Sequence, residues 1–124
     1  MNKVIQFKTR TPAKLEPPRV SALSFVTDAK NIGSKRGGYC HWHVNPTGNY
    51  TDDCELGAKL ANEYLLFIGQ WPTYGNRTLL TCIIRDIIDL AKAGSPWSGV
   101  HVGFLSNVNG YAMTAAHAIH AKEA

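Results

Sequence analysis

Apolar residues recur at helical spacing in the middle of the chain and predict two amphipathic helices. In the first, over residues 50–70, leucines, alanines and aromatic residues follow one face, while acidic and amide residues follow the other. Thr51 or Asp52 is expected to cap the free amides at its start, because side-chain oxygens at such positions accept them. Gly69 and Pro72 are expected to end it.

The second helix follows the loop WPTYGN and runs to Lys92, before Gly94 and Pro96. Asn76 or Thr78 is expected to start it. Isoleucines are frequent in strands, but no strand keeps a helical period over this length. The predicted buried stripe consists of Leu79, Leu80, Ile83, Ile84, Ile87, Ile88 and Ala91. The predicted exposed face consists of Arg77, Thr81, Arg85, Asp86, Asp89 and Lys92.

Residues 98–120 match a third helix better than a hairpin, because more apolar positions fit one helical face than fit strict alternation. Ser98 can cap its start. Asn109-Gly110 is a turn signal, so a hairpin over residues 100–110 stays the alternative. We predict a helix that is broken or strained at this dipeptide.

Several small or acidic residues have a structural explanation. Gly57 and Gly103 are expected to permit close packing of helix on helix. Asp52 and Asp53 are adjacent and diverge by roughly 100° on a helix, so they cannot easily share a proton or an ion. Helix capping explains them better than acid–base chemistry or a magnesium site.

The stretch YCHWHV, residues 39–44, combines a thiol, two imidazoles and an indole. In a short strand, successive side chains point to opposite faces. Cys40, Trp42 and Val44 would then point into the core, and Tyr39, His41 and His43 away from it. We prefer this interpretation of the stretch.

A zinc site is the alternative, since zinc takes about four nitrogen or sulfur ligands. Cys40 with His43 and His117 with His120 form two pairs of suitable spacing. About 73 residues separate the pairs, however, and the usual zinc-finger spacings are not met. A further alternative is a nucleophilic Cys40 or Cys54 with His41, His43 or His101 as its base, but no acid partner or oxyanion loop can be identified. We therefore expect no metal, no cofactor and no catalytic residue.

Trp71, Tyr74 and Trp97 lie in or beside the loops that separate the predicted helices. Aromatic side chains are frequent anchors of protein interfaces, so these three are candidate partner-binding residues. The alternative is that the loop tryptophans cover a small core.

The composition indicates one globular domain: 124 residues, of which 44% are apolar. No apolar run approaches the ~20 residues of a membrane span, and no leader pattern is visible. Three cysteines do not make a disulfide framework, which favours a reducing cytoplasm.

Charge is divided unevenly along the chain. Residues 1–38 carry eight cations and two anions, whereas residues 39–124 carry five cations and seven anions. We interpret the first segment as an extended basic arm in which VSALSFV docks on the core as a short strand. Cations in such an arm can bind phosphates and release counterions. The candidate contacts for nucleic acid or an acidic partner are Lys3, Lys8, Arg10, Lys14, Arg19, Lys30, Lys35 and Arg36.

From about Trp42 onward the chain resembles a group of small hypothetical proteins of alphaproteobacteria. The matching segments are WHVNPTGNYTDDCELGAKLANEYL, LLTCIIRDII and SGVHVGFLSNV, and the basic arm lies outside them. The resemblance implies a bacterial, cytoplasmic, helical protein. It supplies no activity and no binding residue.

Together these patterns predict a mostly α fold: a small three-helix domain over residues 39–124, a basic arm over residues 1–38, and room for one short strand pair. We expect a non-enzymatic regulatory module that binds a protein partner, such as an inhibitor encoded on a mobile element. The arm either contacts nucleic acid or is an ordinary solvated tail, and no membrane is expected. A metalloprotein or hydrolase using Cys40, His43, His117 and His120 is the alternative.

Overall fold

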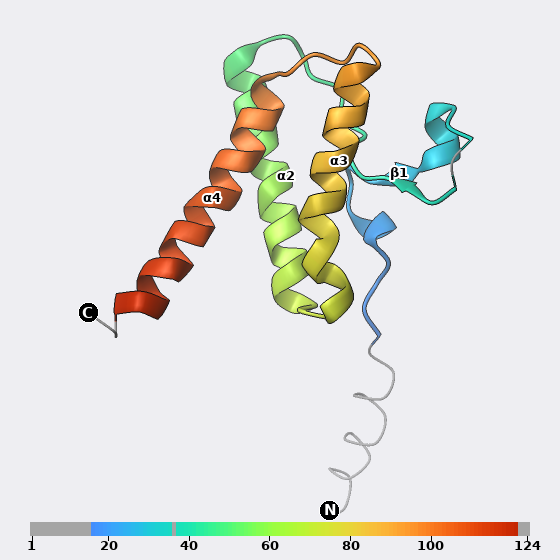
Figure 1. Ribbon diagram of the computed structural model, residues 1–124. Coiled ribbons are helices and arrows are strands. Elements are labelled where there is room, and N and C mark those ends of the chain that lie inside the picture. The colour runs from blue at the N-terminus through green and yellow to red at the C-terminus, as the bar shows by residue number, and fades with distance from the viewer. Residues whose placement is uncertain (1–15, 36, 122–124) are drawn as a thin grey trace, which may run out of the picture.

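The computed structural model describes residues 16–35 and 37–121 and confirms a mostly helical fold with one short strand pair (Figure 1). The described α-helices are α2 (Tyr50–Gln70), α3 (Leu79–Lys92) and α4 (Gly99–His120). Before them, β1 (Thr27–Asp28) pairs antiparallel with β2 (Tyr39–Cys40). Short 3-10 turns cover Val20–Ala22, Ala29–Ile32 and Tyr74–Thr78. In the described part of the chain, no helix is long and apolar enough to cross a bilayer.

The first helix has the predicted bounds but a different cap. Asn49 accepts a hydrogen bond from the Asp52 N–H (2.9 Å), so the prediction of Thr51 or Asp52 as the cap was wrong. Helical geometry already begins at Tyr50, which places both predicted residues inside the first turn. There, acidic side chains still suit the positive end of the helix dipole.

The predicted break in the third helix was also wrong, because α4 continues through Asn109 and Gly110. The Ser98 side chain caps its start by accepting the Val100 N–H, as predicted. A glycine inside a helix costs only about 1 kcal/mol, so the turn signal is too weak to end a helix that is anchored elsewhere.

Phe104 of α4 is the centre of the core. It is fully buried, and its ring lies 5.1 Å from that of Trp42, 5.7 Å from Phe25 and 5.8 Å from Tyr64. These rings come from α2, α4, the loop after β2 and the N-terminal segment. One aromatic cluster therefore joins four parts of the chain.

The N-terminal segment contributes to this same core. Leu23, Phe25 and Val26 are buried in the hydrophobic cluster of the helices, and Ser24 donates from its N–H and hydroxyl to Glu63 of α2. The predicted docking of VSALSFV occurs, although through a 3-10 turn and irregular backbone and not a strand. The core therefore extends across the proposed boundary at residue 38.

One face of α3 differs from the prediction. Asp86, placed on the exposed side, is only 2% exposed, while Ile88, placed in the buried stripe, is about half exposed. The buried side of α3 is centred on Leu79, Ile83 and Ile87. The chain around His41 covers the neighbouring side and supplies the polar partners that Asp86 needs.

Helices α2 and α4 form the most extensive contact between any two of the described elements. A Cβ atom on Gly57 would overlap the carbonyl oxygen of Val100, and one on Gly103 would overlap the carbonyl of Cys54. Gly99 is similarly crowded by Tyr50 and Asp53. The predicted role of Gly57 and Gly103 in close helix packing is confirmed.

A pair of substitutions in α4 tests this crossing. Gly103→Ala should lower the free energy of unfolding by about 1–3 kcal/mol or more, because the added methyl group has to displace backbone. Gly110→Ala meets open space and should leave the stability unchanged or raise it by up to ~1 kcal/mol. Urea unfolding followed by circular dichroism measures both. Equal effects of the two substitutions would contradict the crossing.

Candidate interaction surface

The second half of α4 leaves the body of the molecule. Figure 1 shows α4 beside α2 at its start and diverging from it toward the C-terminus. The last hydrogen bonds between the two helices come from the Asn107 amide, which donates to the Ala58 carbonyl (3.0 Å) and to the Asn62 side chain (2.8 Å). Every residue from 109 to 121 is exposed.

This exposed half, residues 109–121, is called the α4 tail below. It carries large apolar side chains in the open: Met113 is 65% exposed, Ile119 62% and Tyr111 55%. Residues 93–121 contain no Asp, Glu, Lys or Arg. Exposed helices normally show a charged face, and helices without one are normally buried.

An apolar hollow of about 730 Å³ lies beside the tail. It is lined by Asn62, Leu65, Leu66, Ile68, Gly69, Gln70 and Tyr111. Leu66 is 63% exposed, and Asn62 and Gln70 are the only hydrogen-bonding side chains of the lining besides the Tyr111 hydroxyl. The hollow is a groove between α2 and the tail, here called the α2–α4 groove. Its largely apolar lining could pack against the apolar face of another helix.

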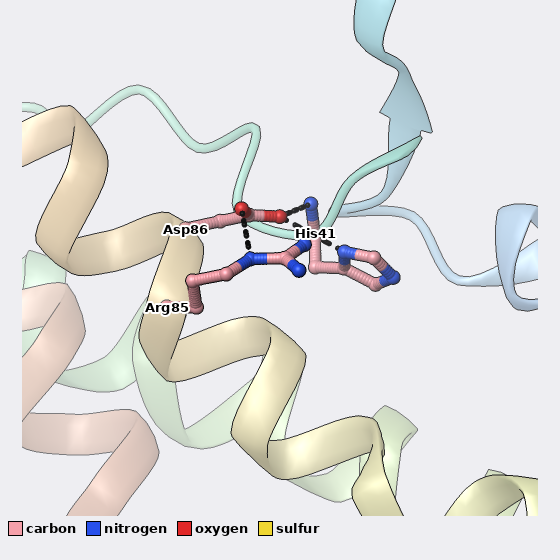
Figure 2. A network of polar contacts seen from close by, with 3 residues as sticks. All are labelled: His41, Arg85 and Asp86. Carbon is pink, nitrogen blue, oxygen red and sulfur yellow. Dashed lines mark hydrogen bonds and ion pairs between the residues drawn. The ribbon is translucent and has the colours of Figure 1, made fainter. Parts of the chain in front are cut away.

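The most buried polar group of α3 is used to hold the chain around His41 (Figure 2). Asp86 accepts the His41 N–H at 2.8 Å, and the same oxygen lies 2.9 Å from His41 Nδ1, while Arg85 Nε approaches the other oxygen at 3.2 Å. Burial acts to raise the pKa of Asp86, but the hydrogen bonds from His41 and Arg85 outweigh it and lower that pKa. The carboxylate is thus a charged anchor for the loop.

A second carboxylate anchors the chain just before α2. Asp53 accepts hydrogen bonds from the Thr47 N–H (2.8 Å), the Thr47 hydroxyl (2.7 Å) and the Gly48 N–H (3.1 Å). These bonds, above all that from the Thr47 N–H, lower the pKa of Asp53. Sequence reasoning assigned Asp53 to a helix cap and missed that it holds the preceding turn.

His101 completes the start of α4. Its Nδ1 accepts the Ser98 N–H at 2.9 Å, which makes Ser98 and His101 a capping box with histidine in the usual place of Glu or Gln. Its ring stacks on Trp97 at 4.5 Å and lies 5.3 Å from Trp42. Burial lowers the pKa of His101, so the imidazole is held neutral.

The residues of the alternative metal site do not converge. Cys40 and Trp42 are buried in the core, as the strand interpretation predicted, although only Tyr39–Cys40 has strand geometry and His41 is buried as well. His117 and His120 lie on the exposed tail. Within residues 16–35 and 37–121, no three His, Cys, Asp or Glu side chains gather as metal ligands would.

The three predicted partner-binding aromatics lie at opposite ends of the helices. Trp71 and Tyr74 are in the α2–α3 connection, where Trp71 packs against the core and the exposed Tyr74 ring lies 5.4 Å from the Arg77 guanidinium. Trp97 is in the α3–α4 connection, stacked on His101. They do not form one surface. The sequence signal for the α4 tail as a candidate surface was a different one, the absence of Asp, Glu, Lys and Arg from residues 93–121.

The predicted basic contacts fall into two groups. Arg19, Lys30 and Lys35 are exposed. The other five lie outside the described residues: Lys3, Lys8, Arg10, Lys14 and Arg36. Nucleic-acid contact through these cations stays a prediction.

Comparisons with protein-family models, with curated proteins and with solved structures find no match for this chain. The resemblance to small alphaproteobacterial proteins therefore stays a prediction. The features of the molecule that bear on function are the α4 tail and the α2–α4 groove.

Removing the Asp86 carboxylate should destabilise the fold. Asp86→Ala leaves the buried His41 N–H without its acceptor and is expected to cost about 1–3 kcal/mol in the free energy of unfolding. Asp89→Ala, on the same helix but exposed, should change stability by less than ~0.5 kcal/mol. Because the folded pKa of Asp86 is lowered, its contribution should be present above pH ~4 and fade as acid protonates it. If Asp86→Ala lowers the free energy of unfolding as little as Asp89→Ala does, the carboxylate does not anchor the loop.

His101 predicts a second pH dependence. Below pH ~6.5 the imidazole binds a proton in the unfolded chain. In the folded chain its pKa is lowered, so it binds that proton only at a lower pH. The free energy of unfolding should therefore decrease as the pH falls. His101→Gln keeps a capping-box acceptor but does not titrate. Its stability should therefore depend less on pH between about 5 and 7 than that of the wild type, measured by urea unfolding. Parallel profiles for the two proteins would contradict this prediction.

Proposed function

We propose that this chain is a small non-enzymatic interaction module that binds a protein partner through the α4 tail and the α2–α4 groove. The observation that carries the proposal is an exposed helix end without Asp, Glu, Lys or Arg, beside an apolar groove. A groove with apolar lining beside exposed apolar side chains is a feature that protein-binding sites share. A regulator or an inhibitor of another protein is the class of function that such a surface fits.

The placement of the polar groups favours this proposal over the metalloprotein or hydrolase alternative. Asp53, Asp86 and His101 are buried groups with shifted pKa values, and such groups are often found among catalytic residues. Each of them already makes hydrogen bonds that hold a loop or a helix end. Cys40 of the alternative site is buried away from the histidines of the tail.

The basic residues support a second, weaker element of the proposal, in which they add affinity for nucleic acid or an acidic partner. Its basis is the charge division of the chain, with eight cations in residues 1–38. Phe25 belongs to the core, so deleting the whole segment would unfold the domain.

The three cysteines are free, which suits the proposed reducing cytoplasm.

Copurification with matched variants tests the proposed surface. The tagged full-length chain is expressed together with untagged copies of itself and purified through its tag. The proteins that copurify with it are quantified by mass spectrometry. Met113→Glu should reduce the recovered partner by about tenfold or more, because it places a charge in the apolar contact. The mutated side chain is exposed, so the fold should be retained.

Ile88→Glu is the matched control, since it changes a half-exposed isoleucine on α3 outside the proposed surface. It should leave the recovered partner unchanged. If Met113→Glu and Ile88→Glu recover the same proteins in the same amounts as the wild type, the α4 tail is not the binding surface.

A further inference from the structure

The α4 tail and the α2–α4 groove are two uncovered apolar elements of one molecule. The tail is an exposed helix with apolar side chains, and the groove is an apolar hollow of about 730 Å³ that a helix face would fill. A foreign helix in the groove would leave the opposite side of the tail in water. A partner that covers both elements at once has to offer both a ridge and a groove.

We propose that the partner is a second copy of this chain, bound across a two-fold axis with the α4 tail of each copy in the α2–α4 groove of the other. This inference rests on the proposed function and names the occupant of its surface. The resulting contact brings α2 and α4 of both copies into a bundle of four helices. In such an isologous contact the tail–groove pairing occurs twice.

Charge favours a copy of the same chain over other occupants. In a two-fold contact every group near the axis meets its own copy, so charged residues there would repel one another. Residues 93–121 contain no Asp, Glu, Lys or Arg, and neither does the lining of the groove. A helix that lies on a membrane surface usually carries Lys or Arg on its polar face, which this tail lacks.

The size of the contact is sufficient. Residues 109–121 form about 20 Å of a helix roughly 10 Å wide, so half of its lateral surface is about 300 Å². If each tail covers a comparable area of the groove and its rim on the other copy, the two contacts bury on the order of 1,200 Å², at the lower end of specific interfaces.

Sedimentation equilibrium of the purified full-length protein tests the proposal. The wild type should approach about 27 kDa, twice the 13.6 kDa of the chain, as its concentration rises. Leu66→Lys in the groove and Ile119→Glu in the tail should each weaken the dimer by about tenfold or more. Both side chains are more than 60% exposed, so circular dichroism melts should show that the monomers stay folded. Ile88→Glu should dimerise like the wild type.

Mixing the two weakened variants is the decisive experiment. A dimer of one Leu66→Lys chain with one Ile119→Glu chain contains one unaltered tail–groove contact and one in which opposite charges meet. The mixture should therefore dimerise more tightly than either variant alone. No recovery on mixing would overturn the tail-in-groove arrangement.

A wild type that stays at 13.6 kDa at every concentration would overturn the second copy as partner. That result is distinguishable from failure of the proposed function. If a monomeric chain still loses a different copurifying protein through Met113→Glu, the surface binds that protein and the proposed function stands. If the wild type is a monomer and Met113→Glu leaves the copurifying proteins unchanged, both proposals fail.

Discussion

The close crossing of α2 and α4 is the constraint on which the rest of the structure depends. Gly57 on one helix and Gly99 and Gly103 on the other let backbone meet backbone, and no side chain larger than hydrogen fits at these positions without a shift. The crossing directs Phe104 into the middle of the core, where rings from α2, the N-terminal segment and the loop after β2 converge on it. The same crossing sets the direction in which α4 leaves the body.

Polar anchors organise the part of the molecule that has little regular structure. The chain before α2 has only two short strands and two 3-10 turns among its described residues, so few of its backbone groups are paired by secondary structure. Asp53 and Asp86 accept several of those groups directly, and each carboxylate is held ionised by the hydrogen bonds it receives. A buried charge is tolerated where such partners surround it. The Asp86 anchor holds His41 next to Trp42, and the His43 N–H donates to the Phe25 carbonyl, so both aromatic residues are tied to the same stretch of chain.

The divergence of α4 divides one helix into two environments. Up to Val108 it packs against the core, and from Asn109 onward it is exposed. Neither half of α4 contains Asp, Glu, Lys or Arg, although only the first half is buried. Apolar side chains such as Met113 and Ile119 are therefore exposed in the second half. This is the physical basis of the proposed interaction surface.

Periodicity alone determined the helices, because their apolar stripes are local patterns of i, i+3 and i+4 neighbours. The positions of α2 and α3 followed from this period. Side-chain chemistry and size predicted the Ser98 cap and the role of Gly57 and Gly103, and strand alternation predicted the burial of Cys40 and Trp42. What depends on contacts between distant residues was not determined in this way. Asp86 is buried because His41, 45 positions away in the chain, supplies its partners, and the α4 tail is exposed because helix crossing, and not composition, decides where a helix leaves the core.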